Sequence, residues 1–261
     1  MNIITLTTDF GLSDHFVGVM KGVILGIQPN PQLIDISHGV QPYDIVDGAF
    51  TIAQAYRYFP KKTIHVVVVD PGVGSTRRPL LAEMAGQYFI APDNGVLSLI
   101  FAREQPVRVR HITNERYFLQ PVSRTFHGRD VFSPIAAHLA AGVTPAQFGT
   151  RIEDFIRASF DAPMQTGKHV WTGTVLKADH FGNVATNFHI DDFPSLRTRA
   201  FALKVGLHVI SRLALTFSEC SPGELFALVG SSGYLEIAAS QASAANALGC
   251  GAGSPVELTI P

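Results

Sequence analysis

A nearly continuous apolar run at residues 63–69 limits the folds open to this chain more than any other feature. The run reads Thr-Ile-His-Val-Val-Val-Val, without the polar alternation of a strand that has one face in water. Strands of this kind lie inside parallel sheets, where helices cover both faces. The run therefore predicts a buried central strand of an α/β domain.

The segments around this run alternate between strand-like and helix-like patterns up to about residue 140. The predicted order is strand 3–8, helix 16–27, strand 32–36, helix 45–56, strand 63–69, hairpin 80–91 and helix 131–140. Apolar residues three and four positions apart identify the helices, and β-rich runs identify the strands. An order in which strands and helices alternate predicts a mostly parallel sheet.

The pattern changes after about residue 165, where helical periodicity fades. Short β-rich runs separated by glycine and serine occur at 170–176, 200–205, 226–229, 234–238 and 256–260. This pattern of short runs is typical of a small antiparallel sheet or barrel. We therefore expect an α/β N-terminal domain at residues 1–160 and a smaller, β-barrel-like C-terminal domain at residues 167–261. The expected linker spans residues 144–166 and contains Pro145 and Pro163.

Charge and composition exclude several classes of protein. Lys and Arg number 20 against 21 Asp and Glu, so the chain lacks the basic excess of a nucleic-acid-binding protein. No apolar run approaches the ~18 residues of a membrane span. Residues 1–10 carry Asp9 and no basic residue, unlike a signal peptide. The cysteines, Cys220 and Cys250, form no metal-binding spacing. We expect a cytoplasmic protein that binds neither nucleic acid nor membrane.

Polar side chains gather where the predicted parallel strands end. Asp9 follows the first strand, Asp70 follows the third, and Asp93 follows the hairpin. Ligands of open α/β sheets bind beyond the carboxyl ends of the strands. The candidate site therefore comprises Asp9, Asp70, Arg77 and His127. An Asp at a strand end is also a common helix cap or turn former, and a single His is often structural. Convergence at one sheet edge favours the functional interpretation.

Two other kinds of site fit part of this pattern. The segment Gly72–Gly74 is similar to a phosphate loop, but no Gly-Lys-Ser or Gly-Lys-Thr follows it and it opens no helix. We expect its glycines to let the backbone turn tightly around a ligand. The Asp and His side chains named above also bind divalent cations. They lack short ligand spacing, however, and Arg77 would lie among them.

Ordered motifs along the whole chain resemble the S-adenosylmethionine (SAM) hydroxide adenosyltransferase family, which is related to fluorinating and chlorinating adenosyltransferases. In the first domain the motifs are Thr8–Gly11, Val17–Val23, Tyr58–Pro60, Val69–Gly74, Ala91–Gly95 and Thr125–Asp130. In the second domain they are Asp179, Phe181–Asn183, Thr186–Asn187 and Gly230–Ala238. The resemblance covers the chain essentially from end to end.

This resemblance implies hydrolysis of SAM to adenosine and methionine, with SAM as substrate and no metal or other cofactor. It also implies a homotrimer whose ligand lies between the N-terminal domain of one subunit and the C-terminal domain of its neighbour. The implied catalytic residues are Asp70, Arg77 and His127. The implied substrate contacts are Asp9 for the ribose hydroxyls, Phe181 and the Ala239 backbone for adenine, Asn183 for adenine or methionine, and Ser231 and Glu236 for methionine.

The residue types suit this chemistry. Attack at the ribose C5′ expels methionine as a neutral thioether, so the leaving group needs no general acid. The attacking water must be positioned, shielded from bulk solvent and relieved of a proton. Arg77 can fix the carboxylate of Asp70, and a histidine such as His127 ordinarily titrates near neutrality. The residue types leave open whether Asp70 or His127 takes the proton.

Two alternative functions remain at this point. A halide-using adenosyltransferase would have the same fold. The halogenating branch carries Tyr at the Asp70 position, Ser at the Gly128 position and a long insertion between Arg78 and Asp93, so all three features favour water here. A non-catalytic nucleoside-binding protein would keep the binding residues but could lose the catalytic set, which this chain retains.

Two details are not specified by the sequence. The resemblance is compatible with the (R) sulfonium epimer of SAM but does not single it out. Tyr43 occupies a position where the halogenating branch carries a tryptophan, so its contact with substrate is open.

Overall fold

The computed structural model describes residues 3–159 and 162–261, and the chain divides into two compact units. The first unit comprises residues 1–158 and the second comprises residues 159–261. Residue 160, the expected end of the first domain, lies outside the described residues. Each unit buries a hydrophobic core of its own.

The first unit contains a seven-stranded sheet in the order β2-β1-β3-β5-β4-β6-β7. The strands are β1 (Ile3–Thr8), β2 (Gln32–Ser37), β3 (Ile64–Val68), β4 (Pro79–Met84), β5 (Gln87–Pro92), β6 (Arg108–His111) and β7 (Arg151–Ile152). Strands β2, β1, β3 and β5 are parallel, whereas β4, β6 and β7 pair antiparallel to their neighbours. β3 is buried along its whole length, as its apolar run predicts. The mostly parallel sheet is confirmed.

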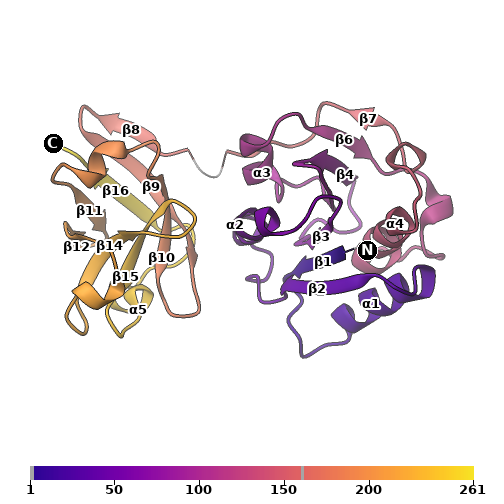
Figure 1. The fold of residues 1–261 in the computed structure, drawn as a ribbon, viewed down its shortest axis with the longest axis horizontal. Helices are drawn as coiled ribbons and strands as arrows, with labels where there is room; N and C mark the ends of the chain where they lie inside the picture. Colours follow the sequence, from indigo (N-terminus) through magenta and orange to yellow (C-terminus); the bar gives the residue numbers. More distant parts are fainter. Residues whose placement is uncertain (1–2, 160–161) are drawn as a thin grey trace. The chain divides into compact units, whose positions relative to one another are not determined.

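Helices cover both sides of this sheet, with α1 (Phe16–Ile27) and α4 (Ser133–Ala140) on one side and α2 (Ile45–Ala55) and α3 (Ser98–Arg103) on the other (Figure 1). α1 buries Met20 and Ile24 in a core that also contains Leu6 of β1. The predicted helix at 131–140 begins earlier, as the π-helical turn η3 (Gly128–Phe132). In the part of the chain that the structure describes, no helix is long and apolar enough to cross a membrane.

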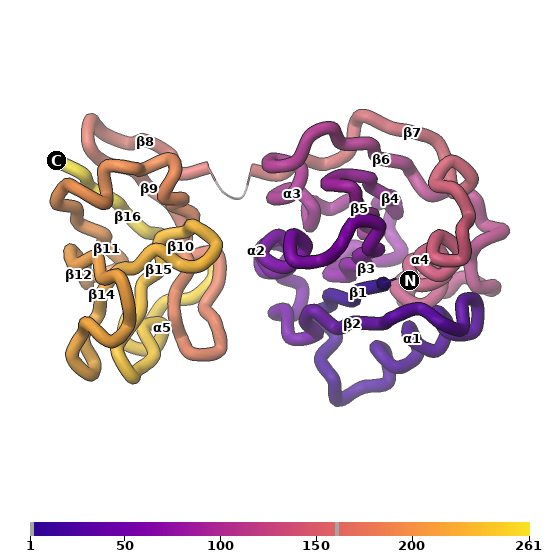
Figure 2. Tube along the Cα trace, in the orientation of Figure 1, coloured from indigo at the N-terminus to yellow at the C-terminus, as the bar shows by residue number. Residues whose placement is uncertain are grey.

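The second unit is a curled, almost wholly antiparallel half-barrel, which confirms the expected barrel-like fold (Figure 2). Its strands are β8 (Met164–Gly167), β9 (Val170–Ala178), β10 (Val184–His189), β11 (Ala202–Val205), β12 (His208–Ile210), β13 (Leu213–Ala214), β14 (Leu225–Val229), β15 (Tyr234–Ala239) and β16 (Pro255–Thr259). They follow the order β12-β11-β16-β9-β10-β15-β14-β13, and β8 pairs with β9. The short helix α5 (Ala244–Leu248) packs against β15.

The sequence pattern does not predict β10, because polar residues occupy buried positions of this strand. Thr186 and Asn187 are almost fully buried. The Thr186 hydroxyl donates to the carbonyl of Leu235 at 2.6 Å, and Asn187 Oδ1 accepts from the backbone N–H of Thr174 at 2.8 Å. Hydrogen bonds to neighbouring strands thus satisfy both side chains, which makes their burial possible.

The expected linker at 144–166 is wrong in its first part. Residues 151–152 form β7, which pairs with β6 of the first unit. Further along, the backbone N–H of Ile156 donates to Asp93 Oδ1 at 2.8 Å, and that of Ala158 donates to Ser98 Oγ at 2.8 Å. Proline and polar composition are typical of a linker, but these tertiary hydrogen bonds hold the segment on the first unit up to residue 158.

Candidate active site

A cavity of about 340 Å³ opens at the carboxyl ends of the parallel strands in the first unit. Its lining consists of Asp9, Phe10, Phe16, Pro42, Tyr43, Val68, Asp70, Val73, Thr125, Phe126, His127 and Gly128. β1 lies between β2 and β3 in the sheet, so the connection from β1 to β2 and the connection from β2 to β3 run over opposite faces of the sheet. Such a switch point is where ligands of open α/β sheets bind. The structure therefore brings three of the predicted residues, Asp9, Asp70 and His127, to one cavity.

Asp9 is half-buried at the end of β1. Its Oδ2 accepts a hydrogen bond from the backbone N–H of Tyr43 at 2.8 Å. Burial raises the pKa of Asp9, the hydrogen bond from Tyr43 lowers it, and the neighbouring charge of Asp70 raises it again, with a raised pKa as the result. Tyr43 adopts a φ of 67°, a conformation uncommon for a non-glycine residue, which aims its N–H at Asp9.

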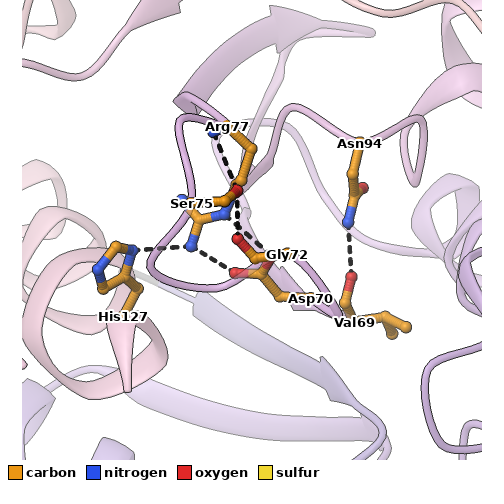
Figure 3. A network of polar contacts seen from close by, with 7 residues as sticks. All are labelled: Val69, Asp70, Gly72, Ser75, Arg77, Asn94 and His127. Carbon is orange, nitrogen blue, oxygen red and sulfur yellow. Dashed lines mark hydrogen bonds and ion pairs between the residues drawn. The ribbon is translucent and has the colours of Figure 1, made fainter. Parts of the chain in front are cut away.

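The three predicted catalytic residues form one hydrogen-bonded network (Figure 3). Arg77 binds the carboxylate of Asp70 with two nitrogens: Nε donates to Oδ1 at 2.9 Å, and Nη2 donates to Oδ2. Arg77 Nη2 also lies 2.8 Å from Nδ1 of His127. The side chains of Asp70 and Arg77 are only 5% and 8% exposed. A bidentate pair of this kind holds both partners in one orientation.

The loop between Asp70 and Arg77 turns sharply enough to bring these two side chains together. Ser75 Oγ donates to the carbonyl of Gly72 at 2.6 Å and accepts from the backbone N–H of Arg77 at 3.3 Å (Figure 3). Gly74 has a φ of +77°, and a Cβ at this position would overlap the carbonyl oxygen of Arg124. The tight turn expected of the glycines is therefore confirmed, and Gly74 allows close approach to the Arg124 backbone.

The hydrogen bond between Arg77 and His127 determines which ring nitrogen carries a proton. A guanidinium only donates, so Nδ1 of His127 is the acceptor and the neutral ring carries its proton on Nε2. Burial lowers the pKa of His127, and the charge of Arg77 lowers it further against the opposing charges of Asp70 and Asp130. His127 is therefore neutral at pH 7 and presents Nε2–H as a donor.

Aromatic rings form the apolar wall of the cavity. The ring centroids of Phe10 and Phe126 lie 5.9 Å apart, those of Phe16 and Phe126 lie 5.2 Å apart, and both pairs meet edge to face. A Cβ at Gly128 would lie 3.2 Å from Met20 Sδ and 3.3 Å from Phe126 Cε2, so a side chain at this position would push into the wall. The rings give the cavity an apolar side next to the polar network.

The second unit has its own pocket, of about 490 Å³, lined by Phe181, Asn183, Phe217, Ala239, Gln241 and Ala242. Three predicted substrate-binding residues, Phe181, Asn183 and Ala239, therefore meet here. Asp179 Oδ1 accepts from the backbone N–H groups of Phe181 at 2.9 Å and Asn183 at 2.8 Å, and its Oδ2 accepts from Asn183 Nδ2 at 2.9 Å. Asp179 thus holds the backbone of this loop and orients the Asn183 side chain.

Ser231 and Glu236 do not line this pocket. Ser231 is exposed in the turn between β14 and β15, whereas Glu236 lies on β15, partly buried, with its carboxylate against Gly230. Burial raises the pKa of Glu236, and the charge of Asp179 raises it further. The structure thus places Ser231 and Glu236 outside the pocket that Phe181, Asn183 and Ala239 share.

Several functional positions are not evident from the sequence. The Tyr43 N–H reaches Asp9 through backbone conformation, which side-chain identity does not reveal. In the aromatic wall, Phe126 is far in sequence from Phe10 and Phe16, although Phe10 and Phe126 stand beside predicted residues. Asp93, a candidate at the hairpin end, is outside the cavity and pairs instead with Arg78 at 2.7 Å. Among residues 3–159 and 162–261, no three His, Cys, Asp or Glu side chains gather as metal ligands do.

Known proteins with similar sequences cover the whole chain. It is 37% identical to an (R)-S-adenosyl-L-methionine hydrolase of Salinispora tropica, over 98% of this chain and 97% of that protein. It is 28% identical to a fluorinase of Nocardia brasiliensis, over 99% and 97% of the two chains. The crystal structure of an uncharacterised conserved protein from Thermotoga maritima matches with a TM-score of 0.89 at 34% identity, over 99% of this chain and 100% of that one.

The matches to family models fall on both units. Residues 4–149 match the SAM hydroxide adenosyltransferase N-terminal domain, and residues 173–257 match the C-terminal domain of the same family. The first match contains the cavity with Asp9, Asp70 and His127, and the second contains the pocket with Phe181 and Asn183. The chain belongs to the SAM hydroxide adenosyltransferase family.

Proposed function

We propose that this protein hydrolyses SAM to adenosine and L-methionine, with a water molecule attacking the ribose C5′. The observation that carries this proposal is the buried Asp70–Arg77–His127 network, which lies beside Asp9 in a cavity with an aromatic wall. Full-length relatives named as (R)-SAM hydrolases support the same reaction. Their names also support the (R) sulfonium epimer as the substrate.

At C5′ the reaction makes one bond and breaks one, and at the water it transfers one proton. Water oxygen forms the new C5′–O bond, the C5′–S bond breaks, and its electron pair stays on sulfur. Positive sulfonium becomes the neutral thioether of methionine, so no proton needs to reach the leaving group. The water loses one proton, which the protein must accept. Catalysis therefore consists of holding the water in line with the C5′–S bond and taking up this proton.

Asp70 is the proposed proton acceptor. His127 already carries its proton on Nε2, because Nδ1 accepts from Arg77, so the ring offers the water a donor rather than a base. Each carboxylate oxygen of Asp70 receives one hydrogen bond from Arg77 and has a further lone pair. In this assignment Asp70 takes the proton and His127 Nε2–H orients the water oxygen. Arg77 holds the side chains of Asp70 and His127 in place.

Asp9 is the proposed ribose ligand. A carboxylate can accept hydrogen bonds from both the 2′- and 3′-hydroxyl groups, and Tyr43 holds one of its oxygens in place at 2.8 Å. The aromatic wall, with Phe10 adjacent to Asp9 in sequence, then covers the sugar and excludes water other than the nucleophile. Binding and chemistry thus use neighbouring strand ends of the same sheet.

The remaining substrate contacts are proposed for the C-terminal domain, residues 167–261. Phe181 and the Ala239 backbone bind adenine, Asn183 binds adenine or methionine, and Ser231 and Glu236 bind the methionine end. The pocket that Phe181, Asn183 and Ala239 share supports this assignment. We propose a homotrimer in which the N-terminal domain of one subunit, residues 1–160, and the C-terminal domain of its neighbour enclose each SAM molecule.

Isotope labelling tests the proposed reaction. The protein is incubated with each SAM epimer in H₂¹⁸O, and the products are analysed by mass spectrometry. We expect one ¹⁸O atom in the 5′-hydroxyl of adenosine, equimolar methionine, and faster turnover of the (R) epimer. An Asp70→Asn variant serves as the control for spontaneous hydrolysis. Adenosine without label, or adenosine formed equally fast by the variant, would contradict the proposal.

A further inference from the structure

A chain of polar contacts runs from the surface of the first unit to the strand end that carries Asp9. Lys21 Nζ donates to Asp35 Oδ2 at 2.6 Å, and Asp35 Oδ1 lies 3.0 Å from His38 Nε2. On its other side, His38 Nδ1 lies 2.8 Å from the hydroxyl oxygen of Thr8. Thr8 is the residue immediately before Asp9. None of Lys21, Asp35 and His38 lines the cavity.

His38 holds the backbone on both sides of Asp9. Thr8 Oγ1, which contacts the His38 ring, accepts the backbone N–H of Phe10 at 3.3 Å. The carbonyl of His38 accepts the backbone N–H of Gly11 at 2.8 Å. The turn Asp9–Gly11 is therefore attached to His38 through a side chain before Asp9 and through the main chain after it.

The Thr8 hydroxyl connects the His38 ring to the backbone that follows Asp9. Nδ1 of His38 lies within hydrogen-bond distance of Thr8 Oγ1, and the same oxygen accepts the Phe10 N–H. On the other side of the ring, Nε2 lies at ion-pair distance from the Asp35 carboxylate. Contacts on both ring nitrogens favour one orientation of the ring.

Burial along this path increases toward the site. The side chains of Lys21 and Asp35 are 32% and 38% exposed, whereas that of His38 is 3% exposed. Burial tends to raise the pKa of Asp35, but the hydrogen bonds from Lys21 and His38 outweigh it and leave the pKa lowered. Asp35 is thus kept charged beside the buried imidazole.

We propose that His38 is a positioning residue that sets the placement of the Asp9 carboxylate for recognition of the ribose hydroxyls. The same loop supplies Tyr43, whose N–H holds Asp9 Oδ2, so the segment after β2 supports Asp9 from two directions. This inference rests on the proposed role of Asp9 as ribose ligand. It does not depend on which group takes the proton from water.

Nucleoside discrimination provides a measurement that a general loss of stability does not change. Adenosine and 2′-deoxyadenosine differ by one hydroxyl, so the ratio of their Kd values reports on the ribose contact. Calorimetry on the full-length protein gives this ratio for the wild type and for Asp9→Asn, His38→Ala and His38→Asn. The amide of asparagine can keep the contact with Thr8, because it occupies the position of Nδ1.

We expect the preference for adenosine to fall about 10-fold or more in Asp9→Asn, the size expected for loss of a hydrogen bond to a charged group. His38→Ala should lower the same ratio about 3- to 10-fold. A variant that combines Asp9→Asn with His38→Ala should lower the ratio little further than Asp9→Asn alone. His38→Asn should restore most of the wild-type ratio. His65→Ala, which removes a buried histidine of β3 that contacts Thr5, is the matched control and should keep the ratio.

Each contrary result has a separate meaning. An unchanged ratio in folded His38→Ala, or an equal fall in His65→Ala, overturns the positioning role of His38. An unchanged ratio in Asp9→Asn removes the ribose role of Asp9 and this inference with it. The isotope experiment tests hydrolysis independently, so failure here is distinguishable from failure of the proposed reaction.

Discussion

The two pockets of this protein differ in the kind of side chain that they present. The cavity of the first unit contains buried charges that pair with one another, Asp70 with Arg77 above all. The pocket of the second unit presents Phe181, the amide of Asn183 and the Ala239 backbone instead. Phe181 is 75% exposed, whereas Arg77 and Asp70 are almost fully covered. The first unit thus buries a pair of opposite charges, whereas the second exposes an aromatic ring beside its pocket.

Sheet topology explains this difference. Parallel strands bring their carboxyl ends to one edge, so Asp9 after β1 and Asp70 after β3 become neighbours and share one electrostatic environment. Neighbouring antiparallel strands end at opposite edges of a sheet, so the second unit collects most of its pocket residues from loops and turns, with Ala239 at the end of β15. Loops offer contact surface to a ligand more readily than they enclose paired charges.

The largest expected effect breaks the charge network of the first unit. Arg77→Met should lower kcat about 1,000-fold, because Asp70 and His127 both lose the group that orients them. It should also lower the free energy of unfolding by about 3 kcal/mol, since a buried carboxylate loses its partner. Adenosine release under saturating SAM and denaturant unfolding measure the two effects.

A charged pair in the second unit provides the control for that experiment. Arg212→Met removes an exposed ion pair with Glu224, and it should change kcat and stability very little. Retention of more than a tenth of wild-type kcat by Arg77→Met would remove this residue from the catalytic network.

Acid should destabilise the first unit through His65, the next largest effect. Burial lowers the pKa of His65 from 6.5 to about 4, against the hydrogen bond that His65 Nε2 donates to Gln87 Oε1, which raises the pKa. The unfolded chain therefore binds this proton at a higher pH than the folded chain does. The stabilisation is complete above pH 6.5 and is lost as pH falls toward 4, with a total of about 3 kcal/mol.

Urea unfolding of the wild type and of His65→Gln at pH 7.5 and pH 4.5 measures this effect. At pH 7.5 the variant is expected to have a lower free energy of unfolding than the wild type. Between pH 7.5 and pH 4.5 its free energy of unfolding should fall by less than that of the wild type. Equal losses in the two proteins would show that other groups cause the acid sensitivity.

A smaller effect is expected from the pocket of the second unit. Phe181→Ala should weaken adenosine binding and raise KM about 10-fold, the size of one lost base–aromatic stack. Because Phe181 is exposed, stability should remain close to wild type. Leu207→Ala, at a 97% exposed position outside the pocket, is the control and should leave KM unchanged. A fall in kcat at saturating SAM, with KM unchanged, would place Phe181 in the chemistry instead.

The smallest effect concerns the pH profile. Protonation of His127 at Nδ1 would break its hydrogen bond with Arg77, so activity should require the neutral ring. Since burial and Arg77 lower the pKa of His127, the midpoint of the acid limb of kcat/KM should lie below pH 6.5. Initial rates at low SAM between pH 5 and pH 8 check this expectation. An acid limb centred at or above pH 6.5 would contradict it.

Some elements were predictable from local pattern and others were not. The boundaries of β1 and α1 agree with the sequence prediction, because β1 is a run of Ile, Leu and Thr and α1 has apolar residues at helical spacing. β10 was missed because its buried Thr186 and Asn187 are satisfied by other strands. The segment 151–158 was assigned to a linker because its contacts lie on distant residues of the first unit.

The sequence by itself determined the α/β fold of the first unit, the β-rich second unit, and the placement of Asp9 and Asp70 directly after parallel strands. Only the tertiary structure decided that Arg77 reaches His127 across 50 positions of sequence, that Tyr43 holds Asp9, and that His38 supports both sides of that residue. The physical reason is the range of each interaction. The periodicity of burial can be recognised from residues close together in the sequence. Hydrogen bonds between strand ends depend instead on strand register and loop closure, which are set only when the whole sheet forms.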